Sequence, residues 1–210
     1  MRISKKQLEM IIDSVPEHPN PRIELEQYNV PGPIAATMLW IAEFKYGDIH
    51  NSIVADLGCG TGRLAIGAAI LGAKHVIGVD IDIVALQVAR ESAYRLNVDH
   101  VIDWINCDVL ELDINVDVVV QNPPFGVQKQ LRHMDVKFLL KAMEIAKRSI
   151  YTLHKSNPKT RALLEKLIKE HGGKISEILK LKFDIKPTYE KHRKRHYVID
   201  VDMYRICLEG

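Results

Sequence analysis

Residues 52–80 read SIVADLGCGTGRLAIGAAILGAKHVIGVD, and this stretch decides the fold. It opens with residues 53–57, a short and mostly apolar run that is typical of a strand buried on both faces of a parallel sheet. Three glycines follow at alternate positions, and from Arg63 onward apolar residues recur at helical spacing. A second apolar run covers residues 76–79. The stretch therefore predicts a strand, a glycine-rich turn, a helix and a second strand, in that order.

The turn and the end of this stretch indicate a bound nucleoside. Gly58, Gly60 and Gly62 would let the backbone approach a ligand closely, where any Cβ atom would clash. Asp80 stands at the carboxyl end of the second strand, where its carboxylate can accept hydrogen bonds from both hydroxyls of a ribose. We therefore expect a nucleoside to bind at the carboxyl edge of the sheet.

Asp56 bears on which nucleoside this is. Residues 60–65, GTGRLA, satisfy the relaxed dinucleotide pattern G-x-G-x-x-A, and a βαβ unit without any ligand can also carry a glycine-rich turn. Asp56 lies two positions before the first glycine and completes the form D-x-G-x-G-x-G. This form resembles the first motif of the class I S-adenosylmethionine-dependent methyltransferases. It favours that cofactor over a nicotinamide dinucleotide or a turn with no ligand.

Length and composition limit the class of protein. A chain of 210 residues with 47% hydrophobic residues suits one α/β domain with a modest extension. No apolar run approaches the ~20 residues that span a membrane, and the charged, helix-patterned start does not resemble a signal peptide. Cys59, Cys107 and Cys207 are odd in number and form no C-x-x-C pair. We therefore expect no disulfide framework, no metal site, no membrane association and a cytoplasmic location.

Residues 1–50 are expected to form a helical extension in front of the main domain, which covers residues 51–210. Residues 4–14 have the pattern of an amphipathic helix, and a proline-containing loop follows them. Residues 25–30, LEQYNV, then lead into a helix that directly precedes the glycine-rich strand. Gln27 and Tyr28 would belong either to a lid over the cofactor or to a connector on the domain surface. The spacing alone does not separate these two interpretations.

Two further strands are expected to end at the same edge of the sheet. Residues 101–106 predict a third strand, and Asp108 lies just beyond it. There its carboxylate can accept a hydrogen bond from the amino group of an adenine ring. The alternative is that Asp108 belongs to a plain surface turn. Residues 117–121 predict a fourth strand, which runs directly into Asn122.

The motif Asn122-Pro123-Pro124-Phe125 is the sharpest chemical signal in the chain. The two prolines make the turn rigid, which leaves the Asn122 side-chain oxygen and the Pro123 carbonyl as two aimed acceptors. Two acceptors suit a planar amino group such as adenine N6, because binding both N–H groups stabilises the positive charge that develops on the nitrogen. Phe125 would offer a face on which an extruded base stacks. An ordinary Asn-Pro turn after a strand is the alternative.

The rest of the chain continues the alternation of helices and strands. Residues 136–148 predict a helix, residues 150–153 a fifth strand, and Asn157-Pro158 the start of another helix. Two last strands are expected at residues 175–183 and 197–208.

Basic residues are expected to contact RNA at two places. Lys129 and Arg132 lie in a polar loop that borders the same pocket. The segment 186–196, between the last two strands, has four cations close together, namely Lys191, Arg193, Lys194 and Arg195. If the sixth strand is parallel to the earlier ones, this segment overhangs the pocket and contacts backbone phosphates. A solvated hairpin tip is the alternative.

Taken together, these residues resemble the small ribosomal-RNA adenine-N6 methyltransferases typified by methyltransferase-like protein 5 and its archaeal relatives. The resemblance covers nearly the whole chain. Its narrowest signals are the tetrapeptides LEQY at residues 25–28 and LHKS at residues 153–156. The glycine turn and the Asn-Pro-Pro-Phe motif are shared by many amino methyltransferases.

The resemblance implies an α/β, Rossmann-like class I methyltransferase fold, with a seven-stranded, mostly parallel sheet whose last strand is antiparallel. It implies cofactor contacts at Gln27, Gly58, Asp80, Asp108 and Val109, and a catalytic tetrad at Asn122, Pro123, Pro124 and Phe125. The full set of residues expected at the cofactor is Gln27, Tyr28, Val30, Asp56, Gly58, Gly60, Thr61, Gly62, Arg63, Asp80, Ile81, Asp108, Val109 and Asn122. Val30 replaces a threonine of some relatives, and Thr61 and Arg63 also differ.

The implied activity is methyl transfer from S-adenosylmethionine to adenine N6 in structured RNA, most simply ribosomal RNA of the small subunit. Two alternatives stay open: methylation of a protein glutamine amide, which presents the same planar NH₂, and a non-catalytic RNA-binding protein that retains the fold. Eukaryotic members of the family need a small zinc-binding activator subunit, so such a subunit is a possible partner.

Overall fold

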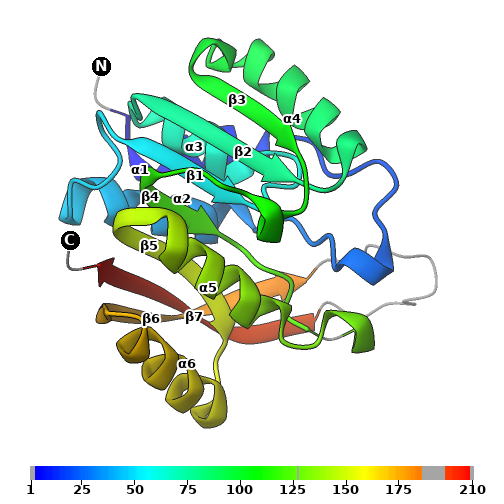
Figure 1. Ribbon diagram of the computed structural model, residues 1–210. Coiled ribbons are helices and arrows are strands. Elements are labelled where there is room, and N and C mark those ends of the chain that lie inside the picture. Colours follow the sequence, from blue (N-terminus) through cyan, green and yellow to red (C-terminus); the bar gives the residue numbers. More distant parts are fainter. Residues whose placement is uncertain (1–2, 127, 186–196, 209–210) are drawn as a thin grey trace.

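The computed structural model of the chain describes residues 3–126, 128–185 and 197–208 (Figure 1). These residues form one seven-stranded sheet in the order β3-β2-β1-β4-β5-β7-β6. The strands are β1 (Ile53–Leu57), β2 (His75–Asp80), β3 (Ile102–Asn106), β4 (Val116–Gln121), β5 (Ala146–Lys155), β6 (Gly173–Ile185) and β7 (Tyr197–Leu208). β7 is antiparallel to both of its neighbours, and the other pairs are parallel. This confirms the predicted fold class.

The strand order explains why distant residues meet at one edge. β1 pairs in parallel with β2 on one side and with β4 on the other. The chain therefore leaves β1 in one direction and later returns to its other side, which creates a crevice at the carboxyl ends of these strands. The glycine turn after β1, Asp80 at the end of β2 and Asn122 after β4 all face this crevice region.

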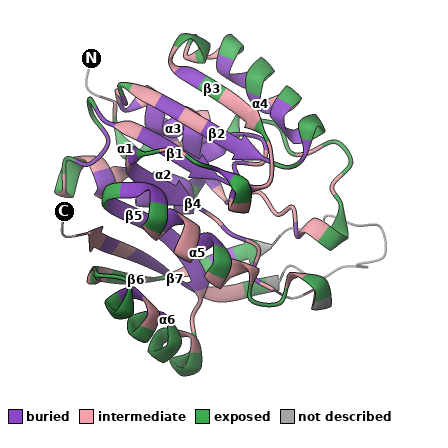
Figure 2. Cartoon of the chain, viewed as in Figure 1, coloured by how far each residue is buried: buried purple, intermediate pink, exposed green. Residues whose placement is uncertain are grey.

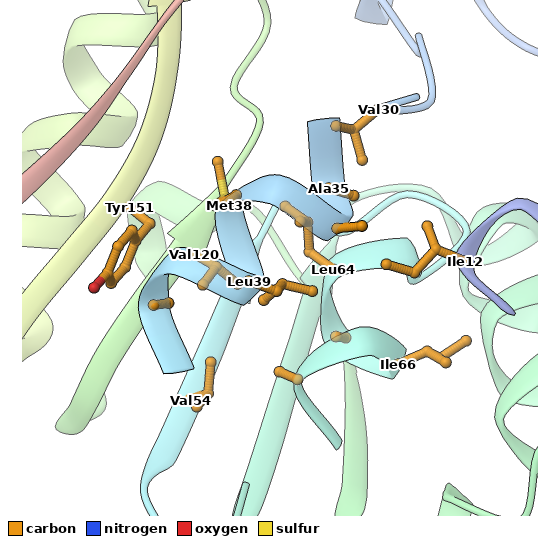
Figure 3. Close-up of a cluster of buried hydrophobic side chains, with 14 of the residues drawn as sticks. Ile12, Val30, Ala35, Met38, Leu39, Val54, Leu64, Ile66, Val120 and Tyr151 are labelled. Carbon is orange, nitrogen blue, oxygen red and sulfur yellow. The ribbon is translucent and has the colours of Figure 1, made fainter. Parts of the chain in front are cut away.

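Helices cover both faces of the sheet. They are α1 (Lys5–Asp13), α2 (Gly32–Trp40), α3 (Arg63–Ile70), α4 (Ile83–Arg95), α5 (Met134–Ile145) and α6 (Pro158–Glu170). Side chains of α1, α2 and α3 pack on one face of the sheet, in a cluster that Figure 3 shows around Leu39, Leu64 and Val120. α5 and α6 pack on the opposite face. Figure 2 shows buried residues along the strands and exposed residues on the outer sides of the helices.

The N-terminal helix α1 shares the core of the main domain. Ser4 and Gln7 form a capping box that satisfies backbone groups at the start of the helix. Leu8 and Ile12 are fully buried in the same cluster as the buried residues of α2 and α3. Residues 1–50 are therefore packed against the sheet domain over the part that the structure describes.

The boundary between α5 and β5 differs from the expectation. The pattern predicted a helix over residues 136–148, but α5 ends at Ile145 and β5 begins at Ala146. Ala146 pairs with Val116 of β4, and the Arg148 guanidinium donates to the Asp48 carbonyl at 3.1 Å and to Ser52 Oγ at 2.6 Å. Asp48 and Ser52 lie about a hundred positions from Arg148 in the sequence, so no local pattern reports these contacts.

Gly62 offers a test of how tightly the turn is packed. Its φ is +85°, and an added Cβ atom would lie 2.7 Å from the Trp104 ring and 3.0 Å from Ala89 Cβ. Gly172 also has a positive φ, +76°, but an added Cβ there would meet nothing within 4 Å. We expect Gly62→Ala to lower the free energy of unfolding by about 1 kcal/mol or more beyond the loss caused by Gly172→Ala, because only Gly62 is overpacked. Urea denaturation of both variants measures this difference, and equal losses would contradict the packing argument.

Candidate active site

A cavity of about 250 Å³ lies at the carboxyl edge of the sheet. Its walls come from the ends of β1, β2 and β4, the turn after β3, and residues 25–30. Of the residues expected at the cofactor, all except Gly62 line this cavity. Of the expected catalytic tetrad, Asn122 and Pro124 line it. The topology thus brings together side chains that are up to about a hundred positions apart in the sequence.

Asp80 is fixed by the backbone around it. Its Oδ2 accepts from the Gly60 N–H at 2.7 Å, and its Oδ1 accepts from the Asp82 N–H at 2.8 Å. Burial raises the pKa of this carboxyl, and the two backbone hydrogen bonds oppose the rise. Each carboxylate oxygen keeps a second lone pair, because each makes one of these bonds. Asp80 can therefore still accept two hydroxyl groups on the cavity side.

Asp56 is a second buried acid in the same wall. Burial raises its pKa to about 8, although the Ala65 N–H donates to its Oδ2 at 2.9 Å and favours the charged form. The negative charge of Asp80 also raises the pKa of Asp56. The raised pKa favours the protonated form of Asp56, which can donate as well as accept a hydrogen bond.

The three glycines of the turn serve different purposes. Gly60, with φ +54°, faces open space, since an added Cβ would meet only Asn29 Oδ1 at 3.8 Å. A Cβ on Gly58 would lie 2.9 Å from the Phe138 ring. Gly62 does not line the cavity, and its Cβ would strike Trp104. The expectation that Gly62 opens the backbone to a ligand is therefore wrong, because its absent side chain makes room for β3.

Residues 15–31, which we call the 15–31 segment, are held to the sheet domain by two charged side chains. Asp82 Oδ2 accepts from Gln27 Nε2 at 2.7 Å and from the Arg22 guanidinium at 3.1 Å. The Arg63 guanidinium donates to the carbonyls of Val15 and Val30 at 3.1 and 3.0 Å. The polar ends of Gln27 and Arg63 therefore bind protein groups, although both residues line the cavity as expected.

The Asn122 side chain is held at one end only. Its Nδ2 donates to the Tyr28 carbonyl at 3.4 Å, whereas its Oδ1 is buried and has no hydrogen-bond partner among the described residues. Pro123 and Phe125 are buried and do not line the cavity. The Phe125 ring packs edge-to-face on Phe183 with a centroid distance of 5.5 Å. Phe125 therefore belongs to the core here and does not present the expected stacking face to the cavity.

Several cavity residues were not expected from the sequence. Glu26 is buried beside Gln27, and Leu131, Met134 and Phe138 supply the apolar wall opposite. Glu26 stands inside the tetrapeptide LEQY, so the sequence held a signal for it. The three apolar residues carry no local signal, because their place depends on how α5 and the 3₁₀ turn before it pack in the tertiary structure.

The expected RNA contacts lie around the cavity or outside the described residues. Lys129 belongs to a short 3₁₀ turn, residues Lys129–Leu131, and Arg132 is exposed immediately after it. Lys191, Arg193, Lys194 and Arg195 lie outside the described residues. β6 is parallel to β5 and ends at Ile185, so it does end at the carboxyl edge as expected, and β7 begins there at Tyr197.

Metal and disulfide chemistry have no support in the part of the chain that the structure describes. No group of three or more His, Cys, Asp or Glu side chains is arranged to hold a metal ion within the described ranges. Cys59, Cys107 and Cys207 are all free thiols. Among the same residues, every helix is too short or too polar to cross a membrane.

The fold and the site together define a class I S-adenosylmethionine-dependent methyltransferase. The strand order with an antiparallel β7, the open backbone at Gly60 and the acceptors of Asp80 fit this cofactor. A family model described as "Ribosomal protein L11 methyltransferase (PrmA)" matches residues 35–139. This range covers the cavity walls from β1 to α5, but it excludes residues 25–30 and stops before β5, β6 and β7.

Full-length comparisons are more specific. The rRNA N(6)-adenosine-methyltransferase METTL5 of Danio rerio is 37% identical, over 95% of this chain and 97% of the relative. An uncharacterized protein of Methanocaldococcus jannaschii is 45% identical, over 97% of this chain and 94% of the relative. The crystal structure of a candidate RNA methyltransferase from Pyrococcus horikoshii superposes with a TM-score of 0.90 at 39% identity, over the whole of both chains. The chain belongs to the METTL5 family of rRNA N6-adenosine methyltransferases.

Proposed function

We propose that the chain transfers a methyl group from S-adenosylmethionine to the N6 amino group of an adenine in ribosomal RNA. The observation that carries this proposal is the buried Asn122 Oδ1, which has no partner among the described residues. An orphaned buried acceptor costs about 1–3 kcal/mol, so it calls for a ligand that donates a hydrogen bond. An amino group with two N–H donors matches this oxygen together with the Pro123 carbonyl at the same turn.

Asn122 and Pro123 would act on the amine while the cofactor supplies the methyl group, activated on a positively charged sulfur. Their two oxygens accept the N6 hydrogens and turn the nitrogen lone pair out of the ring plane. The same hydrogen bonds stabilise the positive charge that develops on N6. Pro123 and Pro124 restrict the turn, and Pro124, which is bonded to the Pro123 carbonyl, lines the cavity, so both acceptors would need little reorganisation.

We propose that Asp80 binds the ribose hydroxyls and that Asp108 binds the adenine amino group of the cofactor. Asp108 lines the cavity next to Val109 and caps a short turn through its Oδ1, which accepts from the Leu110 N–H at 2.9 Å. Its Oδ2 does not take part in this hydrogen bond and would be the oxygen that accepts from the ligand. Tyr28, Val30, Asp56, Gly58, Gly60, Thr61 and Ile81 would form the surrounding walls.

We also propose that residues 1–50 act as a cofactor lid on a methyltransferase domain of residues 51–210. Asp82 lies two positions after Asp80 and accepts hydrogen bonds from Gln27 and Arg22 of the 15–31 segment. One short turn thus supports both the predicted ribose acceptor and the lid. This arrangement favours the lid interpretation over a passive connector.

A protein substrate is the second candidate, because the matching PrmA family model is described as a protein methyltransferase. Incubating the protein with radiolabelled S-adenosylmethionine and either in vitro transcribed ribosomal RNA or total ribosomal protein decides between the two. We expect label in RNA, as N6-methyladenosine. Label in protein would support the second candidate, and no label in either would support a non-catalytic role.

The finer assignments belong to the same proposal. They are the small-subunit RNA as substrate, a small zinc-binding activator as partner and a cytoplasmic location. The named relatives support RNA of the ribosome in general. Separate transcripts of small- and large-subunit RNA test the first of these assignments.

The basic segment should add to RNA affinity in a salt-dependent way. We expect that replacing Lys191, Arg193, Lys194 and Arg195 together with Gln flattens the slope of log affinity against log salt by up to about three, because each phosphate contact contributes ~0.7–0.9. Binding of S-adenosylmethionine should not change. RNA titrations of both proteins at several salt concentrations measure this effect. Equal slopes would show that the segment is a solvated hairpin.

A further inference from the structure

Glu26 is a buried carboxylate that faces the cavity. Its residue exposure is 6%, and it lines the same cavity as Asn122. Its Oε1 accepts from the Gln128 N–H at 2.6 Å. Its Oε2 is buried and has no hydrogen-bond partner among the described residues. Within the described part of the chain, Glu26 Oε2 and Asn122 Oδ1 are therefore both buried acceptors without a hydrogen-bond partner on residues that line the cavity.

The backbone of Glu26 is in an unusual conformation. It has φ 50° and ψ 44°, in the left-handed region that a residue with a side chain rarely adopts. The Tyr28 N–H donates to the Glu26 carbonyl at 2.7 Å and closes a tight turn. Strain of this kind is typical of functional sites, where the surrounding structure holds a side chain in a required place. A glycine would satisfy this turn without strain but would supply no carboxylate.

Two sets of hydrogen bonds place Glu26 at the Asn122 end of the cavity, and an electrostatic effect on Tyr28 agrees with them. Gln128, which Glu26 binds, lies three positions after Phe125 of the catalytic motif. Asn122 donates to the backbone carbonyl of Tyr28, and the Tyr28 N–H donates to the backbone carbonyl of Glu26. Burial raises the pKa of the Tyr28 hydroxyl, and the negative charge of Glu26 raises it further. The carboxylate is thus close enough to this wall to act on it electrostatically.

We propose that Glu26 is the counter-charge and proton acceptor for the reacting amine. This inference rests on the function proposed above. The N6 lone pair forms the new N–C bond while the C–S bond breaks and its electron pair stays on sulfur. N6 is then positive, and a buried carboxylate beside it stabilises the charge as it develops. Glu26 Oε2 then takes one proton from N6, and the electron pair of the broken N–H bond stays on nitrogen. The neutral acid later releases this proton to water.

The α-ammonium group of the cofactor is another cationic nitrogen that could form an ion pair with this carboxylate. The two cases make different predictions. A counter-charge for the amine affects the methyl-transfer rate at saturating cofactor, whereas a ligand of the ammonium group affects cofactor affinity.

Glu26→Gln separates these cases with little change of shape. The amide keeps an oxygen to accept from Gln128 but presents NH₂ in place of the unpaired carboxylate oxygen. Glu24→Gln is the matched control, because Glu24 is exposed in the turn Ile23–Leu25 and its change removes the same charge two positions away. Single-turnover methylation of ribosomal RNA transcripts is measured at saturating S-adenosylmethionine. Rates are normalised to the fraction of protein that binds cofactor by calorimetry, so partial unfolding does not affect the result.

We expect Glu26→Gln to lower the single-turnover rate at least tenfold, with cofactor affinity within about twofold of the wild type. Glu24→Gln should match the wild type in both. A normal rate for Glu26→Gln, or a loss confined to cofactor affinity, would overturn the inference. If the wild type methylates no RNA, the proposed function itself fails; if Asn122→Ala is inactive while Glu26→Gln is normal, only the role of Glu26 fails.

Discussion

Replacing Asn122 with alanine is expected to lower the single-turnover methylation rate by ~10²-fold or more, while cofactor affinity changes little. The reason is that Asn122 Oδ1 has no partner in the described structure and would bind the amine most strongly when its nitrogen becomes positive. An interaction made mainly in the transition state lowers the rate and not the binding when it is lost. Rapid-quench kinetics with saturating RNA and cofactor measure the rate, and calorimetry measures cofactor affinity.

Asn122→Asp provides the comparison. An aspartate keeps an acceptor at Oδ1, but it replaces the donor to the Tyr28 carbonyl, a long hydrogen bond of 3.4 Å, with a second acceptor oxygen and adds a negative charge when ionised. We therefore expect it to keep much more activity than the alanine variant. If Asn122→Ala retains a near-normal single-turnover rate, the motif is only a rigid turn, and the acceptor mechanism must be abandoned.

The second large effect is expected at Asp80. Asp80→Ala should weaken S-adenosylmethionine binding by about 1.5–3 kcal/mol, because two ribose hydroxyls would lose their charged acceptor. This corresponds to a loss of about 10-fold to 150-fold in affinity. The substitution also removes the acceptor for the Gly60 and Asp82 N–H groups, so part of the loss would come from a looser turn.

Two further measurements identify the source of that loss. Asp103→Ala removes an exposed carboxylate of β3 that pairs with His75 at 2.9 Å, and it should leave cofactor affinity unchanged. RNA affinity of the Asp80 variant, measured without cofactor, should also be unchanged. Tight binding of NAD and no binding of S-adenosylmethionine by the wild-type protein would refute the cofactor assignment.

Much of the fold was predictable because its signals are local. The apolar run of β1, the glycine turn and the helix that begins at Arg63 occupy one short stretch. The spacing of apolar residues differs clearly between the strand and the helix. Asp80, Asp108 and Asn122 each directly follow or end a predicted strand. In a parallel sheet such positions share one edge, so strand prediction was enough to expect them in one site.

The tertiary structure decided the features that depend on contacts between distant residues. Arg148 belongs to β5 and not to α5 because it reaches Asp48 and Ser52 across the sheet. Gly62 is required by Trp104 of β3, and Phe125 is turned into the core by Phe183 of β6. Both partners lie forty or more positions away in the sequence, so no local pattern reports them.

The same division applies to the site. The sequence by itself determined the class I fold, and it predicted the edge for the cofactor and Asn122 as the acceptor, because each depends on residue type and position in a strand or turn. Only the tertiary structure showed that Arg63 and Gln27 connect the 15–31 segment to the sheet domain, and that Glu26 is buried with one oxygen that has no hydrogen-bond partner among the described residues. The physical reason is that pairing and burial of a polar group depend on which elements pack around it, and these come from the whole chain.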